Sequence, residues 1–100
     1  MVEVSWTPQS ISDVNSIAEY IARDSHHFAQ VQVSRFFAHV AVLESKPLAG
    51  RIVPEFQSKS IRELIVGNYR IVYRVVSVRQ IDIVTVHHSA RILKRKHIKK

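Results

Sequence analysis

Two arginines lie within a segment whose other residues are typical of a buried β-strand. In "GNYRIVYRV", residues 67–75, Arg70 and Arg74 are separated by Ile, Val and Tyr. Because a desolvated arginine without a partner costs far more free energy than one strand residue recovers, both must reach water, an acidic partner or a bound anion. The segment therefore predicts either ion pairs on the outer face of a sheet or a site for a phosphate or an acidic partner.

Hairpin signals in the second half of the chain predict the strands that carry these arginines. "IRELIV" and "YRIVYRVV" flank Gly67-Asn68, a two-residue turn signal, and "QIDIVTVHH" is typical of a third strand, joined by a three-residue loop at 77–79. This register pairs Val76 with Gln80, Arg74 with Asp82 and Arg70 with Val86. The face expected to form the core consists of Leu64, Val66, Tyr69, Ile71, Tyr73, Val75, Ile81 and Ile83, with Arg62 at its margin and His87 on the same side. The other face is expected to collect Glu63, Arg70, Arg74, Asp82 and His88 among Ile65, Val72, Val84 and Val86.

The first half of the chain predicts two helices that cover the core face. Thr7 suits an N-cap, Pro8 suits the first helical position, and apolar residues then recur at helical spacing. "SHH" at 25–27 interrupts the pattern and is expected to form the loop between the helices, and a second amphipathic helix ends before Pro47. With "VEVSW" at 2–6 as a short strand, we expect an α+β fold of order β-α-α-β-β-β. An antiparallel two-helix hairpin then packs on a three- to four-stranded, mainly antiparallel sheet.

Positive charge is concentrated at the C-terminal end. The last ten residues, "RILKRKHIKK", hold six of the 15 Lys and Arg residues and none of the eight acidic residues, so the first 90 residues are nearly balanced. One hundred residues suffice for one core, and we expect a single domain over 1–90 and a basic tail over 91–100. Such a tail suits nucleic acid, an acidic protein, a ribosomal surface or a solvated end.

Several classes of protein are disfavoured by composition. The chain has no cysteine, no apolar run near the roughly 20 residues that span a bilayer, and no N-terminal pattern of a secretory signal. We therefore expect a cytoplasmic protein that does not enter a membrane. The spacing of His26, His27 and His39 does not indicate a metal site.

Four segments in order resemble the RelE/ParE superfamily of bacterial toxins. "LAGRIVPEF", "IRELIVGNYRIVYRV" and "VHHSAR" are similar to three of its blocks, and "ISDVNSIAEYI" matches its helical hairpin. The resemblance covers nearly all of the chain. It implies the toxin of a type II toxin–antitoxin system, held inactive in a hetero-oligomer with its antitoxin.

Two activities occur in this superfamily, and the resemblance leaves both open. RelE-like members cleave mRNA in the ribosomal A site, whereas ParE-like members inhibit DNA gyrase. For the nuclease, the resemblance implies Glu55 as base, Arg70 as phosphate clamp and His88 as general acid, with no metal or cofactor. However, Ser89 stands where a tyrosine often follows this histidine.

The local residue pattern favours the ParE-like activity by a small margin. "GR-x-VPE", "REL" and "H-x-A-R" are closer to ParE-like sequences, and a nearly neutral body suits a protein target. A family member that only binds its antitoxin is a third possibility. Binding of phosphate or of a partner is expected of Arg51, Lys59, Arg62, Arg74, Arg91 and Lys94.

Overall fold

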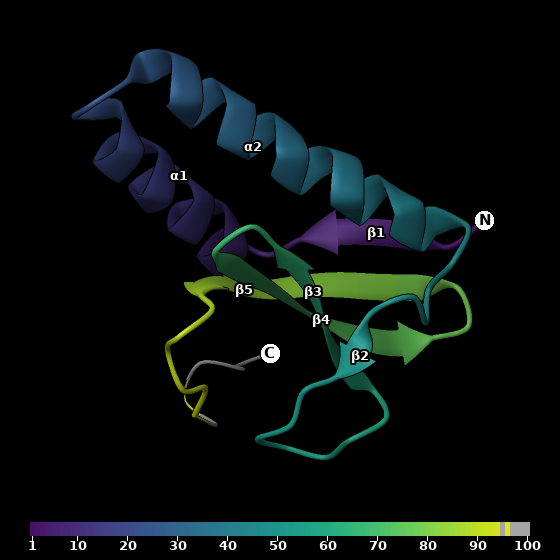
Figure 1. Ribbon diagram of the computed structural model, residues 1–100. Coiled ribbons are helices and arrows are strands. Elements are labelled where there is room, and N and C mark those ends of the chain that lie inside the picture. Colours follow the sequence, from purple (N-terminus) through teal and green to yellow (C-terminus); the bar gives the residue numbers. More distant parts are fainter. Residues whose placement is uncertain (95, 97–100) are drawn as a thin grey trace.

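The computed structural model describes residues 1–94 and 96, and its elements follow the expected order. The first half comprises β1 (Glu3–Trp6), α1 (Pro8–Ala22), α2 (His26–Ala41) and the short 3-10 helix η1 (Val42–Glu44). The second half comprises β2 (Arg51–Ile52), β3 (Ile61–Val66), β4 (Tyr69–Ser77) and β5 (Gln80–His88). Both helices lie on one side of the sheet, and the loop after β2 and the C-terminal segment lie on the other (Figure 1). The α+β class and the helical hairpin are confirmed.

The strands form one mixed sheet in the order β1-β5-β4-β3-β2. β1 runs parallel to β5, and the other three neighbouring pairs are antiparallel, as expected for a mainly antiparallel sheet. The sheet has five strands instead of three or four, because Arg51–Ile52 adds an edge strand, β2, beside β3. A strand of two residues is too short to show alternation in the sequence.

Both helices begin at side-chain caps. The hydroxyl of Thr7 accepts the N–H of Ser10 at 3.2 Å, as the sequence predicts for an N-cap. The hydroxyl of Ser25 accepts the N–H of Phe28 at 3.1 Å and starts α2. The histidines at 26–27 are therefore the first residues of α2, and their expected place in a loop is wrong. Neither helix, nor any other in the part of the chain described, is long and apolar enough to cross a membrane.

The main core lies between the helices and the sheet, where α1 packs against β5 and α2 against β3. Its buried residues are Val14, Phe36, Val40, Leu43, Val66, Ile71, Tyr73, Ile81, Ile83 and Val86. Leu64, Tyr69 and Val75 are partly buried against it. The expected core face is therefore confirmed, with Val86 as an addition that the sequence placed on the other face.

The turn between β4 and β5 is one residue shorter than expected. Ser77 pairs with Gln80, which leaves a two-residue turn, and Val76 is an extra residue between two pairs. This bulge compensates for the shorter turn, so the pairing register beyond it is the expected one and Arg74 still pairs with Asp82.

A second irregularity in the same strand pair reverses the faces of the last residues of β5. Val84 is the extra residue, and Arg70 pairs with His87 instead of Val86. Val86 and His88 consequently turn toward the helices, whereas His87 turns toward the opposite face. The expected faces of these three residues are wrong, because the alternation along β5 is broken at Val84.

Candidate functional site

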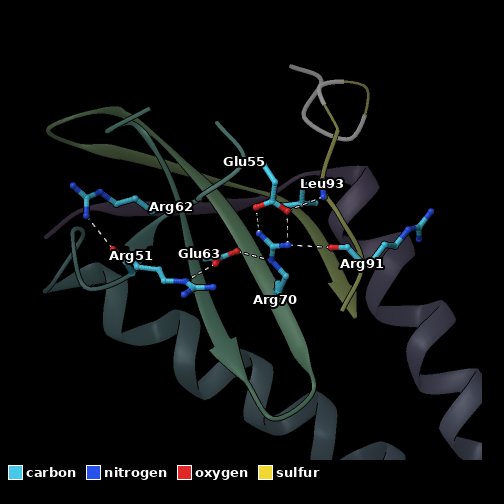
Figure 2. A network of polar contacts seen from close by, with 8 residues as sticks. Arg51, Glu55, Arg62, Glu63, Arg70, Arg91 and Leu93 are labelled. Carbon is cyan, nitrogen blue, oxygen red and sulfur yellow. Dashed lines mark hydrogen bonds and ion pairs between the residues drawn. The ribbon is translucent and has the colours of Figure 1, made fainter. Parts of the chain in front are cut away.

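A network of charged side chains is centred on Arg70 (Figure 2). It lies on the second face of the sheet, the one opposite the helices. The residue is only 5% exposed. Its Nε donates to Glu63 at 2.6 Å, and its two terminal nitrogens donate to the Glu55 carboxylate at 2.8 Å each. One terminal nitrogen also donates to the carbonyl of Arg91 at 3.0 Å. Arg70 therefore directs four hydrogen bonds to acceptors within the protein, including a bidentate pair with Glu55.

The network continues toward the edge of the sheet. Glu63 is 1% exposed, and its second oxygen accepts a hydrogen bond at 2.6 Å from Nε of Arg51, whose side chain reaches solvent. Charges thus alternate in the order Arg51, Glu63, Arg70 and Glu55. A buried charge is tolerated when opposite charges and hydrogen bonds offset its desolvation, and both buried members have such partners.

The ion pair between Arg70 and Glu55 holds two segments on this face of the sheet: the loop between β2 and β3, and residues 91–93. Glu55 lies in the loop between β2 and β3, and its Oε2 also accepts the N–H of Leu93 at 3.0 Å. Together with the bond from Arg70 to the carbonyl of Arg91, this contact fixes the backbone of residues 91–93. The C-terminal segment therefore does not leave the sheet directly after β5.

A small second core lies beneath these segments. Leu93, only 3% exposed, packs with Val53 and Val72, and Phe56 and Ile61 lie against them. The first residues of the expected basic tail thus pack on the sheet. Residues 95 and 97–100 of that tail lie outside the described part of the chain.

Hydrogen bonds from Arg70 are the main cause of the acidity of Glu55. They lower the pKa of Glu55 from 4.5 to about 2, against the opposing effect of burial, and the N–H of Leu93 adds to the lowering. The same contact raises the pKa of Arg70. At neutral pH Glu55 is therefore a carboxylate engaged by Arg70. A general base, by contrast, works best with a pKa near the operating pH.

Of the three residues implied as a catalytic set, the structure brings two together. Glu55 and Arg70 are in direct contact. His88 pairs with Tyr69 instead, and the two rings pack edge to face with centroids 5.8 Å apart. His88 therefore lies on the side of the helices, and His87 occupies the place beside Arg70 that the sequence assigned to His88.

The other expected binding residues do not gather into one patch. Arg62 donates to the carbonyls of Lys59 and Gly50 at 3.0 Å each, which ties it to the loops beside β3. Arg74 borders an open hollow on the second face together with Asp82, and within residues 1–94 and 96 these two form no ion pair. Arg51 belongs to the network around Arg70, while Lys59, Arg91 and Lys94 are exposed.

A second polar cluster, which the sequence did not indicate, joins α1 to the bulge in β5. One carboxylate oxygen of Asp13 accepts the hydroxyl of Thr85 at 2.5 Å and the N–H of Val86 at 2.9 Å. The other oxygen accepts the side-chain amide of Gln9 at 2.8 Å. No local signal could reveal the contact with β5, because Asp13 lies more than 70 residues from Thr85 and Val86. Among the described residues, no three His, Asp or Glu side chains are grouped as metal ligands.

Comparisons with known proteins agree with this fold. A family model described as "ParE toxin of type II toxin-antitoxin system, parDE" matches residues 4–93. A solved structure, "Chromosomal ParDE TA system from P. aeruginosa", is similar with a TM-score of 0.70 and 20% sequence identity, over 88% of this chain and 96% of that chain. No curated protein matches the sequence. At this identity the structural likeness shows the fold, whereas the family model matches most of the sequence itself.

Proposed function

The chain belongs to the ParE toxin family of type II toxin–antitoxin systems, and we propose that it stops bacterial growth by binding DNA gyrase. As a toxin of this type it has an antitoxin as partner. The proposal concerns the target and the mode of action: inhibition of a protein in the cytoplasm, without cleavage of RNA by the toxin.

The burial and the hydrogen bonds of Arg70 are the observation that favours gyrase inhibition over cleavage of RNA. Cleavage by attack of a ribose 2′-OH needs a base to remove its proton and free cationic donors to stabilise the pentavalent phosphate. Arg70 is buried and already makes four hydrogen bonds to acceptors within the protein, the pKa of Glu55 is about 2, and His88 lies on the other side of the sheet. This arrangement supports a structural role for the network and favours a toxin that acts by contact with a protein.

Two assays on one preparation of toxin test the proposal. One measures supercoiling and DNA cleavage by purified gyrase, and the other maps cuts in a translated mRNA by primer extension. We expect the gyrase reaction to respond and the mRNA to stay intact, with activity lost when the antitoxin is added. Cuts at codon positions that require ribosomes would overturn the proposal in favour of a RelE-like endoribonuclease.

The variant His88→Gln sharpens the comparison. As a general acid, His88 would contribute roughly 10²–10⁴ to a cleavage rate, and the substitution would abolish toxicity. Since its ring packs on Tyr69 away from Arg70, we expect His88→Gln to keep its toxicity in cells. Loss of toxicity in a variant that remains folded would count against gyrase inhibition.

We further propose that the antitoxin covers the exposed face of α2. This helix carries no acidic residue, and it exposes apolar side chains, among them Phe28 at 64%. An apolar and acidic segment of the antitoxin complements that surface, and a stable interface buries roughly 1,200–2,000 Å².

Substitution of Phe28 tests this placement of the antitoxin. We expect Phe28→Ser to weaken the complex at least tenfold, measured by calorimetry. The matched control is Val78→Ser, which changes an apolar residue that is 89% exposed at the turn between β4 and β5. Equal affinities for both variants would place the antitoxin elsewhere. If expression of the toxin without antitoxin is harmless to cells, the chain is not an active toxin.

A further inference from the structure

A hollow of about 200 Å³ lies between α1 and the end of β5. Its lining includes His87, Arg91 and Lys96, together with Gln9 and Asp13. Within residues 1–94 and 96, neither Arg91 nor Lys96 takes part in an ion pair. Two positive charges therefore border the hollow without an ion pair to any carboxylate of residues 1–94 and 96.

The acid in the lining offsets these positive charges only in part. The oxygens of Asp13 accept hydrogen bonds from three neutral donors, which belong to Gln9, Thr85 and Val86. Asp13 is thereby held against β5 and brings one negative charge to the hollow, against two positive charges from Arg91 and Lys96. The balance at the hollow is positive.

The network around Arg70 sets the position of Arg91. Its backbone carbonyl is held by Arg70, and the N–H of Leu93, two residues on, is held by Glu55. The side chain of Arg91 points away from Arg70 and from the network (Figure 2). Arg70 is thus a positioning residue for a second arginine, and that second arginine is the one exposed to solvent.

We propose that this hollow binds a phosphate group of a nucleic-acid backbone, with Arg91 and Lys96 as its cationic contacts. The sequence from Arg91 onward holds six of the 15 basic residues and no acid, whereas the preceding 90 residues are nearly balanced. A run of cations can contact several successive phosphates of a nucleic-acid strand. A single carboxylate of a protein partner would contact only one or two of these cations. The inference goes beyond gyrase inhibition, since it concerns contact with nucleic acid whatever the protein target is.

Fluorescence anisotropy with the whole toxin chain and no gyrase tests the proposal. The probes are a labelled 20-base-pair duplex DNA of random sequence and a labelled single-stranded RNA of the same length. We expect the logarithm of the binding constant to fall linearly with the logarithm of salt concentration. Preference for one probe identifies which nucleic acid is the source of the phosphate. Absence of binding to both probes at low salt would overturn the proposal.

Paired variants assign the binding to the hollow. In the double variant Arg91→Gln/Lys96→Gln we expect the salt slope for DNA to decrease by about 0.9 for each phosphate that the toxin no longer neutralises. The control, Arg23→Gln/Arg79→Gln, removes the same charge from exposed positions outside the hollow. Equal decreases in both double variants would show that only net charge matters and would overturn the proposal.

Titration with inorganic phosphate, followed by nuclear magnetic resonance, provides a second readout. Shifts concentrated at the side chain of Arg91 and at the neighbouring end of β5 are expected. Shifts of similar size spread over the whole surface would mean an adventitious ion only, and the assignment of this hollow would then be wrong.

Discussion

The carboxylate of Asp13, in helix α1, accepts the backbone N–H of Val86 at 2.9 Å. Val86 lies in β5 beyond Ile83, where pairing with β1 ends, and it follows the bulge at Val84. Asp13 thus takes the place of a strand partner at this edge of the sheet. The contact stabilises the register of β5 in which His87 pairs with Arg70 and lies on the same face of the sheet.

Removal of this acceptor should weaken the fold. In Asp13→Ala the N–H of the buried residue Val86 has no acceptor, which typically costs about 1–3 kcal/mol. We expect a loss of that size in the free energy of unfolding, measured with urea. Asp24→Ala, at an exposed position after α1, is the control and should change stability by less than about 0.5 kcal/mol. Similar effects of the two substitutions would refute the role of Asp13.

Arg70 should be the most sensitive charged residue of the sheet. The variant Arg70→Met leaves the buried carboxylate of Glu63 without its nearest buried cation, and loss of one partner of a buried pair costs about 3–5 kcal/mol. Arg74→Met, on the same strand and without an ion pair among the described residues, should cost far less. The double variant Arg70→Met/Glu63→Met should recover part of the stability. No recovery would mean that packing, and not charge, dominates at this position.

The acidity of Glu55 predicts a defined pH dependence. Its pKa is about 2 in the folded protein and 4.5 in the reference state, so folding favours the ionised form. The resulting stabilisation is fully present above about pH 5 and is lost as the pH falls toward 2. We expect it to be on the order of 1 kcal/mol, because part of the carboxylate is screened by water. The difference in unfolding free energy between the wild type and Glu55→Gln should therefore shrink as the pH falls from about 5 to about 2, and a difference that stays constant over this range would contradict this origin.

The hydroxyl of Tyr73 should contribute measurably to stability. Buried beneath the helices, it accepts the N–H of Gly50 at 2.9 Å and donates to the carbonyl of Pro47 at 3.0 Å. Tyr73→Phe leaves both groups without this partner, and we expect a loss of about 1–3 kcal/mol by chemical denaturation. Tyr20→Phe, at an exposed site on α1, should be neutral.

Much of the fold could be predicted because its signals are local. The turn at Gly67-Asn68 is recognisable from two residues, and Gly67 has the positive φ of 60° that suits glycine in such turns. Thr7, the expected N-cap, lies directly before the helix that it starts. The register between β3 and β4 follows from this turn, because a two-residue turn at 67–68 pairs Val66 with Tyr69.

The remaining features depend on contacts between distant segments. The bulge at Val84 is stabilised by Asp13, and no pattern within β5 indicates which residue will be extra. Glu55 and Arg70 are both recognisable as candidates, but their direct pairing depends on how the loop after β2 folds back over the sheet. The same holds for Leu93, an apolar residue in a segment whose composition suggests a solvated tail.

The parallel pairing of β1 with β5 constrains the time at which the toxin can complete its fold. Glu3 to Trp6 find their partners only at Gln80 to Ile83, so this edge of the sheet cannot form until most of the chain has been synthesised. Pairings of such large sequence separation also slow folding, whereas the helical hairpin can form early from local contacts. During translation there is consequently an interval in which the residues of α1 and α2 have been synthesised but the sheet is unfinished. An antitoxin that recognises α2 could bind in that interval, before an active toxin has been released.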